Sequence, residues 1–320
     1  MRQVQTVAPV TDQSKLDDYY CTLKSESLGP LWVSLKGLVP SEPRPKAVPY
    51  VWEYAKVRPR LLEAGELITA EEAERRVLVL ENPGLPGASQ ITDTIYAGLQ
   101  LILPGEIAPA HRHSQSALRF VIEGTGAYTA VDGERTTMHP GDFIITPAWT
   151  WHDHGSAADG PVIWMDGLDV PLVRFLGTGF REEHDEMAQI ITRPEGDSDA
   201  RYGAGMLPLN SKPTHTSPIF NYPYARTREA LHQLTLTGAP DPHHPYPLRY
   251  VNPTTGDWPI PPPATTLPPL PPGFTSRPYR STDGAVLVLV EGSLNAKVGQ
   301  SSFALNAKDV LAIPAWTEYS

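Results

Sequence analysis

Three histidines in this chain have the residue type and the spacing to do chemistry. His111 and His113 flank Arg112, and His152 follows a strand-like run at residues 143–146. Because successive side chains of a β-strand point to opposite faces, His111 and His113 should share one face, with Arg112 on the other. Imidazole is a common metal ligand, so the three residues predict a metal site once His152 returns to that face.

The residues between these histidines have the pattern of short antiparallel strands. Residues 120–124 and 127–131 predict a hairpin, whose end is marked by Asp132-Gly133, a strong two-residue turn signal. A second turn signal at 139–142 precedes the strand-like run. We therefore expect antiparallel strands to bring the third histidine back to the first two.

This spacing resembles the double motif of the cupin family. The matching residues are Gly105, His111, His113 and Gly124 in the first half, and Gly141, Pro147 and His152 in the second. The glutamate that cupins usually add as a fourth ligand would fall at Ala117, and Trp149 stands where a glycine is usual. The resemblance implies a three-histidine centre with open coordination positions.

Composition limits the classes of function. Of 320 residues, 40% are hydrophobic and 19% are charged, which is ordinary for a globular protein. No apolar run approaches the roughly 18 residues of a membrane span, and the N-terminus lacks the apolar region of a secretion signal. The net charge of −10 argues against nucleic-acid binding, and the single cysteine, Cys21, excludes an intramolecular disulfide. A cytoplasmic location is expected.

Helices are expected mainly near the N-terminus. Residues 14–24 predict one helix, with Ser14 as its N-cap, and residues 31–38 predict a second. The capping box at 69–72 predicts a third helix over 69–80. From residue 91 onward, short strands with glycine turns indicate an antiparallel barrel.

The pattern of the histidine segment repeats near the C-terminus. Pro104-Gly105 matches Pro272-Gly273 at an offset of 168 (272 − 104). At that offset His111 and His113 fall on Tyr279 and Ser281. In the later segment the offset is 167 (316 − 149), so His152 falls on Tyr319, and this second copy should hold no metal of the same kind. Because the first copy continues for about twenty residues past its third histidine, we expect the second barrel to lack its closing strands at the C-terminus.

The expected fold is therefore mainly β, a bicupin of two double-stranded β-helix or jelly-roll barrels with an N-terminal helical extension. We expect four segments: an N-terminal helical and extended arm at 1–88, the metal-binding cupin at 89–180, a helix and proline-rich connection at 181–270, and a degenerate, incomplete cupin at 271–320.

From Arg75 to Phe175 the chain resembles the gentisate 1,2-dioxygenase family, with the salicylate and 1-hydroxy-2-naphthoate dioxygenases as close relatives. The segments that carry the resemblance include AERRVLVLENPGL, IYAGLQLILPGEIAPAHRHSQSALRF, GDFIITPAWTWHDHG and WMDGLDVPLV. The resemblance implies a cytoplasmic, homotetrameric oxidoreductase of aromatic catabolism that uses Fe(II) and O₂. It would open gentisate (2,5-dihydroxybenzoate) between the carboxylated and hydroxylated carbons to give maleylpyruvate.

The resemblance also implies roles for residues around the histidines. Arg119, six residues past His113 and expected on the same strand face, would pair with the substrate carboxylate through its two-pronged guanidinium. Arg75 would assist from the preceding helix. His154, two residues past His152, would bind a substrate oxygen or act as an acid or base. The remaining implied roles are a ring-binding wall at Tyr96, orientation of O₂ by Gln100, and an outer hydrogen-bond partner at Asp166.

Several alternatives remain open from the sequence. Zn²⁺ fits three histidines as well as iron does, so the choice of Fe(II) rests on the family resemblance. Salicylate and 1-hydroxy-2-naphthoate share the carboxylate and adjacent hydroxyl of gentisate, so the ligand set does not separate these substrates. A non-catalytic bicupin is favoured by the incomplete second barrel, and three-histidine thiol dioxygenases and sugar isomerases are further cupin alternatives. The expected partners are a small aromatic hydroxy-carboxylate and other copies of the chain, without nucleic acid or membrane.

Overall fold

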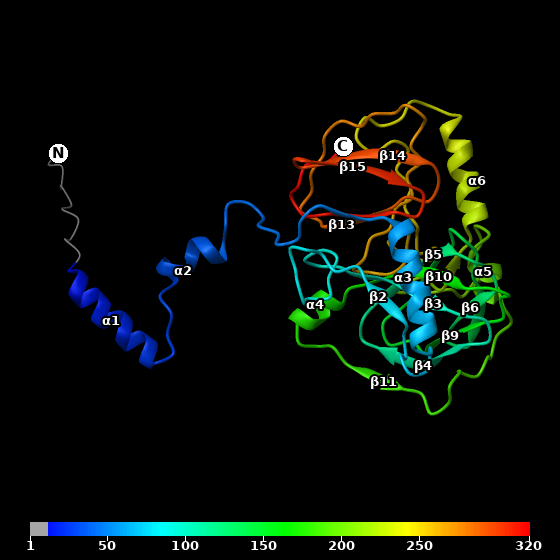
Figure 1. Ribbon diagram of the computed structural model, residues 1–320, viewed down its shortest axis with the longest axis horizontal. Coiled ribbons are helices and arrows are strands. Elements are labelled where there is room, and N and C mark those ends of the chain that lie inside the picture. The colour runs from blue at the N-terminus through cyan, green and yellow to red at the C-terminus, as the bar shows by residue number, and fades with distance from the viewer. Residues whose placement is uncertain (1–11) are drawn as a thin grey trace. The chain divides into compact units, whose positions relative to one another are not determined.

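The chain separates into two compact units, Met1–Arg44 and Pro45–Ser320, and the computed structural model describes residues 12–320. In the first unit lie helices α1 (Gln13–Ser25) and α2 (Leu31–Leu38) (Figure 1). Both helices were predicted, but the N-cap of α1 is Asp12 and not Ser14. The carboxylate of Asp12 accepts a hydrogen bond from the backbone N–H of Lys15, which leaves Ser14 inside the first turn.

The second unit contains a barrel made of two antiparallel sheets. Its six-stranded sheet has the order β12 (Asn221–Tyr222), β8 (Phe143–Thr146), β5 (Ala117–Glu123), β10 (Val162–Leu168), β3 (Tyr96–Ile102), β2 (Val77–Val79). Its five-stranded sheet has the order β11 (Arg181–Glu183), β4 (Ile107–His113), β9 (His152–Ser156), β6 (Ala127–Val131), β7 (Glu134–Thr137). Ile102 and Val121 of the first sheet and Ala127 of the second belong to one buried cluster, so the two sheets pack face to face.

The predicted hairpin between 120–124 and 127–131 is wrong. Strand β5 pairs with β8 and β10, whereas β6 lies in the opposite sheet and pairs with β7 and β9. Gly124 and Gly126 have φ angles of 85° and 99°, which let the chain cross from one sheet to the other. The true hairpin joins β6 to β7, and its turn is Asp132-Gly133, with positive φ at both residues as a type I′ turn requires.

The predicted helix over 69–80 is also wrong. The capping box forms, because Thr69 Oγ1 accepts from the N–H of Glu72 and the Glu72 carboxylate accepts from the N–H of Thr69, both at 3.1 Å. Only a turn follows, and Val77–Val79 then pair with β3 as strand β2. Val77 and Val79 are β-branched and pair with the edge of β3, and this pairing overrides the local preference for a helix. The helix of this region precedes the turn, as α3 (Tyr54–Leu67).

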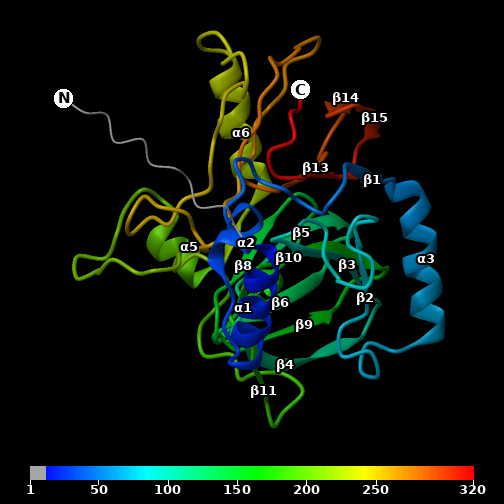
Figure 2. The ribbon, with the colours of Figure 1, turned by 90° about the vertical axis from the view of Figure 1, so that its left-hand side faces the viewer.

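A smaller set of strands forms the second β region. Strands β1 (Tyr50–Trp52), β16 (Val310–Ile313) and β13 (Ala285–Val288) form one sheet in that order, and β14 (Ser293–Val298) pairs with β15 (Ser301–Asn306). Figures 1 and 2 show these strands on one side of the large barrel, with α3 along the flank. The mainly β architecture is therefore confirmed. The lack of closing strands and the boundaries at 88, 180 and 270 stay predictions.

The connection between the two β regions carries short helices. These are α4 (Val170–Phe175), α5 (Asp197–Tyr202) and α6 (Tyr224–Thr235). Arg228 of α6 pairs with Glu291 of the second β region at 2.8 Å, which ties the connection to that region. Among residues 12–320, no helix combines the length and apolar character that crossing a membrane requires.

Glu123, at the end of β5, joins three separate parts of the second unit. Arg58 of α3 lies 2.6 Å from its carboxylate, Tyr54 donates to it at 2.9 Å, and Lys308 lies at 3.4 Å from the turn before β16. Burial alone would raise the pKa of Glu123, but the hydrogen bonds from Arg58 and Tyr54 outweigh it and hold the pKa below the ordinary value. The ionised carboxylate therefore stabilises the folded state.

We predict that Glu123→Gln lowers the free energy of unfolding by roughly 1.5–3 kcal/mol at pH 7, the range for hydrogen bonds to charged groups. Because the folded pKa lies below that of the unfolded chain, this contribution is present above about pH 4.3 and is lost as the pH falls through the folded pKa. Urea unfolding at pH 7 and at about pH 3 measures both effects. Glu63→Gln, which removes an exposed pair with Arg60, is the control. A difference between Glu123→Gln and wild type that does not change with pH would contradict the assignment.

Candidate metal centre

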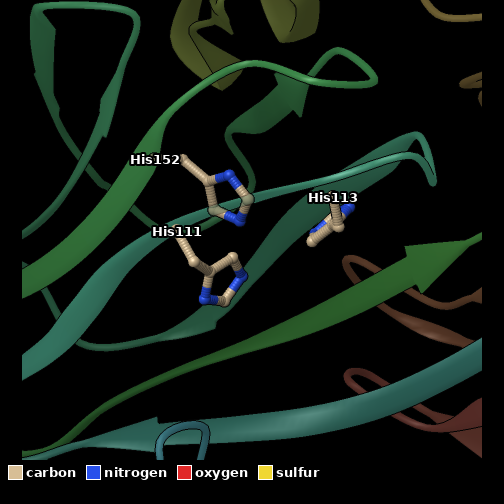
Figure 3. Close-up of side chains that lie close together, drawn as sticks. All are labelled: His111, His113 and His152. Carbon is tan, nitrogen blue, oxygen red and sulfur yellow. The ribbon is translucent and has the colours of Figure 1, made fainter. Parts of the chain in front are cut away.

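Backbone pairing between β4 and β9 brings the three histidines together. The ladder places His111 opposite His152, and His113 lies two residues further along the same strand face. In Figure 3 the three rings point toward one another. Their ring centroids are 4.5–5.4 Å apart, and one nitrogen from each lies within 4.8 Å of the others. The structure thus brings together the three histidines that the sequence predicted as ligands.

Two carbonyl groups determine which ring nitrogen is free in His113 and in His152. The Nδ1 of His113 lies 2.9 Å from the carbonyl oxygen of Gln115, and the Nδ1 of His152 lies 3.1 Å from that of Thr150. A carbonyl only accepts, so Nδ1 carries the proton in both rings and Nε2 keeps its lone pair. These partners are the usual outer contacts of metal-bound histidines, so the donor set fits a divalent ion.

The histidines are held in the neutral form that metal binding requires. Burial lowers the pKa of His111 to about 2, and the nearby charge of Arg75 acts in the same direction. Burial also lowers the pKa of His113 to about 4 and that of His152 well below its ordinary value. At neutral pH the site therefore presents three uncharged imidazoles.

Arg119 approaches the histidines from the opposite sheet. It was expected on the same strand face as His113, but it lies on β5, opposite Asp166 of β10 in the ladder. Its Nε is 3.3 Å from Asp166 Oδ1, and its Nη1 donates to Thr146. Burial raises the pKa of Asp166 to about 6, against the attraction of Arg119, so the carboxylate is ionised at neutral pH. The pair fixes a buried guanidinium inside the barrel.

His154 lies next to the ligand histidines on β9 and is fully buried. Its Nδ1 is 3.0 Å from the hydroxyl of Thr129, and its Nε2 has no hydrogen-bond partner among residues 12–320. Burial and the charge of Arg119 lower its pKa well below the ordinary value. His154 therefore enters the barrel as a neutral imidazole with one free ring nitrogen.

The other predicted site residues lie around the same interior. Tyr96 and Gln100 share one face of β3 with Ile102, which belongs to the buried cluster between the sheets. Arg75 was expected on a helix but lies in the turn before β2, where its Nη2 donates to Pro109 O at 2.9 Å and lies 3.4 Å from His111 Nε2. Burial lowers the pKa of Arg75 to about 9, which leaves it charged at neutral pH.

Two polar residues of the interior were missed by the sequence analysis. Thr129 on β6 contacts His154, and Thr146 on β8 accepts from Arg119. Both are fully buried. A hydroxyl at an inward position of an otherwise apolar strand is the signal that would have found them, once the inward face of each strand was known.

Comparison with known proteins places this geometry in a family. The cupin domain model matches residues 98–170. Gentisate 1,2 dioxygenase 1 of Aquipseudomonas alcaligenes is 52% identical over 308 residues, which cover 96% of this chain and 88% of that protein. The chain belongs to the gentisate 1,2-dioxygenase family. The predicted family and the predicted dioxygenase class of enzyme are thereby confirmed.

Other members of the family are similar over most of their length. The 1-hydroxy-2-naphthoate 1,2-dioxygenase of Nocardioides sp. (strain KP7) is 34% identical over 87% of this chain and 72% of its own. The crystal structure of salicylate 1,2-dioxygenase from Pseudoaminobacter salicylatoxidans with gentisate is 32% identical, has a TM-score of 0.85, and covers 99% of this chain and 89% of that one. The match over nearly the whole chain confirms the bicupin fold.

We predict that His111→Ala abolishes metal retention, because only two ligands remain. Loss of an outer contact of a ligand already weakens metal affinity by about 10–100-fold, so loss of a ligand itself should weaken it further. Metal content after loading with Fe(II) and anaerobic dialysis measures the loss. His232→Ala, which changes an exposed histidine on α6, is the matched control and should retain metal as wild type does. Equal metal content in the two variants would remove His111 from the site.

Proposed function

We propose that the chain is an Fe(II)-dependent gentisate 1,2-dioxygenase that opens the ring of gentisate with O₂ and yields maleylpyruvate. The observation that carries the proposal is one interior in which three neutral histidines face a buried, oriented arginine. The histidines suit a metal that keeps open coordination positions, and the arginine suits a planar carboxylate. The gentisate dioxygenase that is 52% identical to this chain supports the choice of substrate.

His111, His113 and His152 would hold the iron, one per chain. Three neutral imidazoles suit Fe(II), although they suit Zn²⁺ as well, so the choice of iron rests on the family. Bound there, Fe(II) would supply the redox chemistry that lets O₂ react with an aromatic ring. Residues of the chain would bind the substrate carboxylate, position its hydroxyl and ring, and orient O₂.

Arg119 binds the carboxylate of the substrate. Its Nη1 donates to Thr146, and its Nε lies 3.3 Å from Asp166 Oδ1 as an ion pair without a hydrogen bond. Its Nη2 has no hydrogen-bond partner among the described residues. A charge in this water-poor interior interacts strongly with an anion, and its fixed orientation reduces the ordering cost of binding. Arg75, beside His111, adds a second positive charge near the same place.

His154 accepts a hydrogen bond from a substrate hydroxyl. The hydroxyl of Thr129 donates to the sulfur of Met138 at 3.4 Å, so the Nδ1–H of His154 donates to Thr129 and Nε2 is left as an acceptor. The low pKa of this buried ring favours a positioning contact over proton transfer near neutral pH. Tyr96 would form part of the wall against the ring, and Gln100 would orient O₂.

Salicylate and 1-hydroxy-2-naphthoate are the second candidate substrates, because relatives with those names are 32% and 34% identical to this chain. Both molecules present the same carboxylate and neighbouring hydroxyl to the histidines and Arg119. A cytoplasmic homotetramer is proposed on the family resemblance. A non-catalytic bicupin is disfavoured by the intact set of histidines.

We predict that anaerobically iron-loaded protein consumes O₂ fastest with gentisate. An oxygen electrode, together with the ultraviolet absorbance of the ring-opened product, measures the rates with gentisate, salicylate and 1-hydroxy-2-naphthoate. Uptake with salicylate or the naphthoate but none with gentisate would transfer the proposal to that substrate. No uptake with any of them, from protein that retains iron, would favour the non-catalytic bicupin.

We predict that Arg119→Lys raises KM for gentisate by about 10–100-fold and leaves iron content unchanged. Lysine keeps the charge but loses the planar fork, and a hydrogen bond to a charged group contributes about 1.5–3 kcal/mol, where 1.4 kcal/mol is tenfold. Steady-state kinetics and iron analysis measure the two quantities. An unchanged KM would remove the carboxylate-binding role from Arg119.

A further inference from the structure

Arg112 lies between the two histidines of β4 and projects from the opposite face of the strand. Its guanidinium carbon is 4.4 Å from the ring centroid of Trp149 and 4.6 Å from that of Trp151. Its Nε and Nη2 donate to one carboxylate oxygen of Glu182 on β11, at 2.9 and 2.6 Å. We call this group, Arg112 with Trp149, Trp151 and Glu182, the arginine clamp.

The clamp acts on the loop that leads to the third ligand. The backbone N–H of Trp149 donates to the carbonyl of His113 at 2.7 Å, and the carbonyl of Thr150 accepts from His152 Nδ1. Trp149 has a φ angle of 63°, an unfavourable conformation for a bulky residue that persists only where surrounding contacts hold it. Stacking against Arg112 is one such contact. The loop therefore touches His113 and His152 directly, and the clamp holds the loop.

The ladder between β4 and β9 is interrupted beside the ligands. The β4–β9 ladder is irregular between Ala108 and His111, immediately before the ligands. His152 is also paired in regular register with Val131 of β6, so the interruption bears on β4, the strand of His111 and His113. Contacts from outside the β4–β9 ladder can therefore support β4, and the clamp is attached to β4 next to the interruption.

The second β region contains a reduced copy of the clamp. Arg280 lies 4.4 Å from the ring centroid of Trp316, which has a φ angle of 58° and donates its N–H to the carbonyl of Ser281 at 2.6 Å. Tyr279 and Tyr319 form an antiparallel bridge, as His111 and His152 do in the first barrel.

The copy lacks the second aromatic ring of the clamp. Glu318 occupies the position of Trp151 at the same offset of 167 (318 − 151 and 316 − 149). Two aromatic rings thus flank the arginine on the strand that carries the histidines, and one ring flanks it where they are replaced.

We propose that Arg112 is a positioning residue of the metal centre, which holds the loop of Trp149 and Trp151 against β4 so that the three imidazoles are preorganised for one ion. This inference rests on the proposed metal-dependent function. Arg112 faces away from the barrel interior, so it contacts neither substrate nor metal. Its effect reaches the site through the backbone contacts of Trp149 with His113 and of Thr150 with His152.

The test compares Arg112→Gln with Arg280→Gln, the same change in the reduced copy. Affinity for Fe(II), and for Co²⁺ as a spectroscopic probe, is measured by competition with a chelator on the full chain. We expect Arg112→Gln to weaken affinity for both ions by about 10–100-fold, the range for outer contacts of metal sites, and to change the visible spectrum of bound Co²⁺. Arg280→Gln should leave the affinity and the spectrum as in wild type.

Two further variants keep the test decisive should Arg112→Gln fold poorly. Arg112→Lys retains a cation over the two rings and should recover part of the affinity. Trp149→Gly suits the positive φ, keeps the N–H that bonds to His113, and should weaken the affinity because one stacking surface is lost. Wild-type affinity in Arg112→Gln or in Trp149→Gly, or an equal loss in Arg280→Gln, would overturn the proposal.

The experiments can reject the proposed function and this inference independently of each other. Absence of O₂ uptake by iron-loaded wild type would reject the dioxygenase assignment. The effect of Arg112 on Co²⁺ affinity would remain measurable in the same preparation, because it does not depend on turnover.

Discussion

The antiparallel pairing of β4 with β9 is the constraint on which the rest of the site depends. It places His111 opposite His152, although 40 residues separate them in the chain (112 to 151). Backbone hydrogen bonds make this contact, so it does not require the imidazoles themselves. The same pairing carries His154 to the inner side of the barrel. Burial then keeps the rings neutral, which is the form that binds a metal.

Strand register also pairs the charged side chains of the barrel interior. A buried guanidinium is costly unless it is paired, and the register of β5 with β10 sets Asp166 beside Arg119. Nη2 of this guanidinium is left to bind an anion in a medium that screens charge poorly. An anionic substrate can therefore be bound by a chain whose net charge is −10, because the local field near Arg119 and Arg75 differs from the global one.

Comparison of the two β regions distinguishes the contacts that form the strands from the residues that would bind a metal. Tyr279 and Tyr319 keep the strand contact of His111 and His152, and Trp316 keeps the left-handed turn of Trp149. Strand pairing and turn geometry thus tolerate replacement of all three ligands. Glu123, which binds Arg58, Tyr54 and Lys308, joins the two regions, so the second contributes to the stability of the first.

Local signals in the sequence determined the parts of this protein that depend on near neighbours. The period of two placed His111 and His113 on one face with Arg112 on the other, and Asp132-Gly133 marked a tight turn. The family resemblance, also read from the sequence, named the remaining site residues. Tertiary structure alone decided which strands pair: it turned 77–79 into a strand beside β3 despite the capping box at Thr69, and it placed Arg119 across the barrel from His113. The physical reason is that a strand satisfies its hydrogen bonds on a partner that is distant in the chain, whereas a turn or cap satisfies them within a few residues.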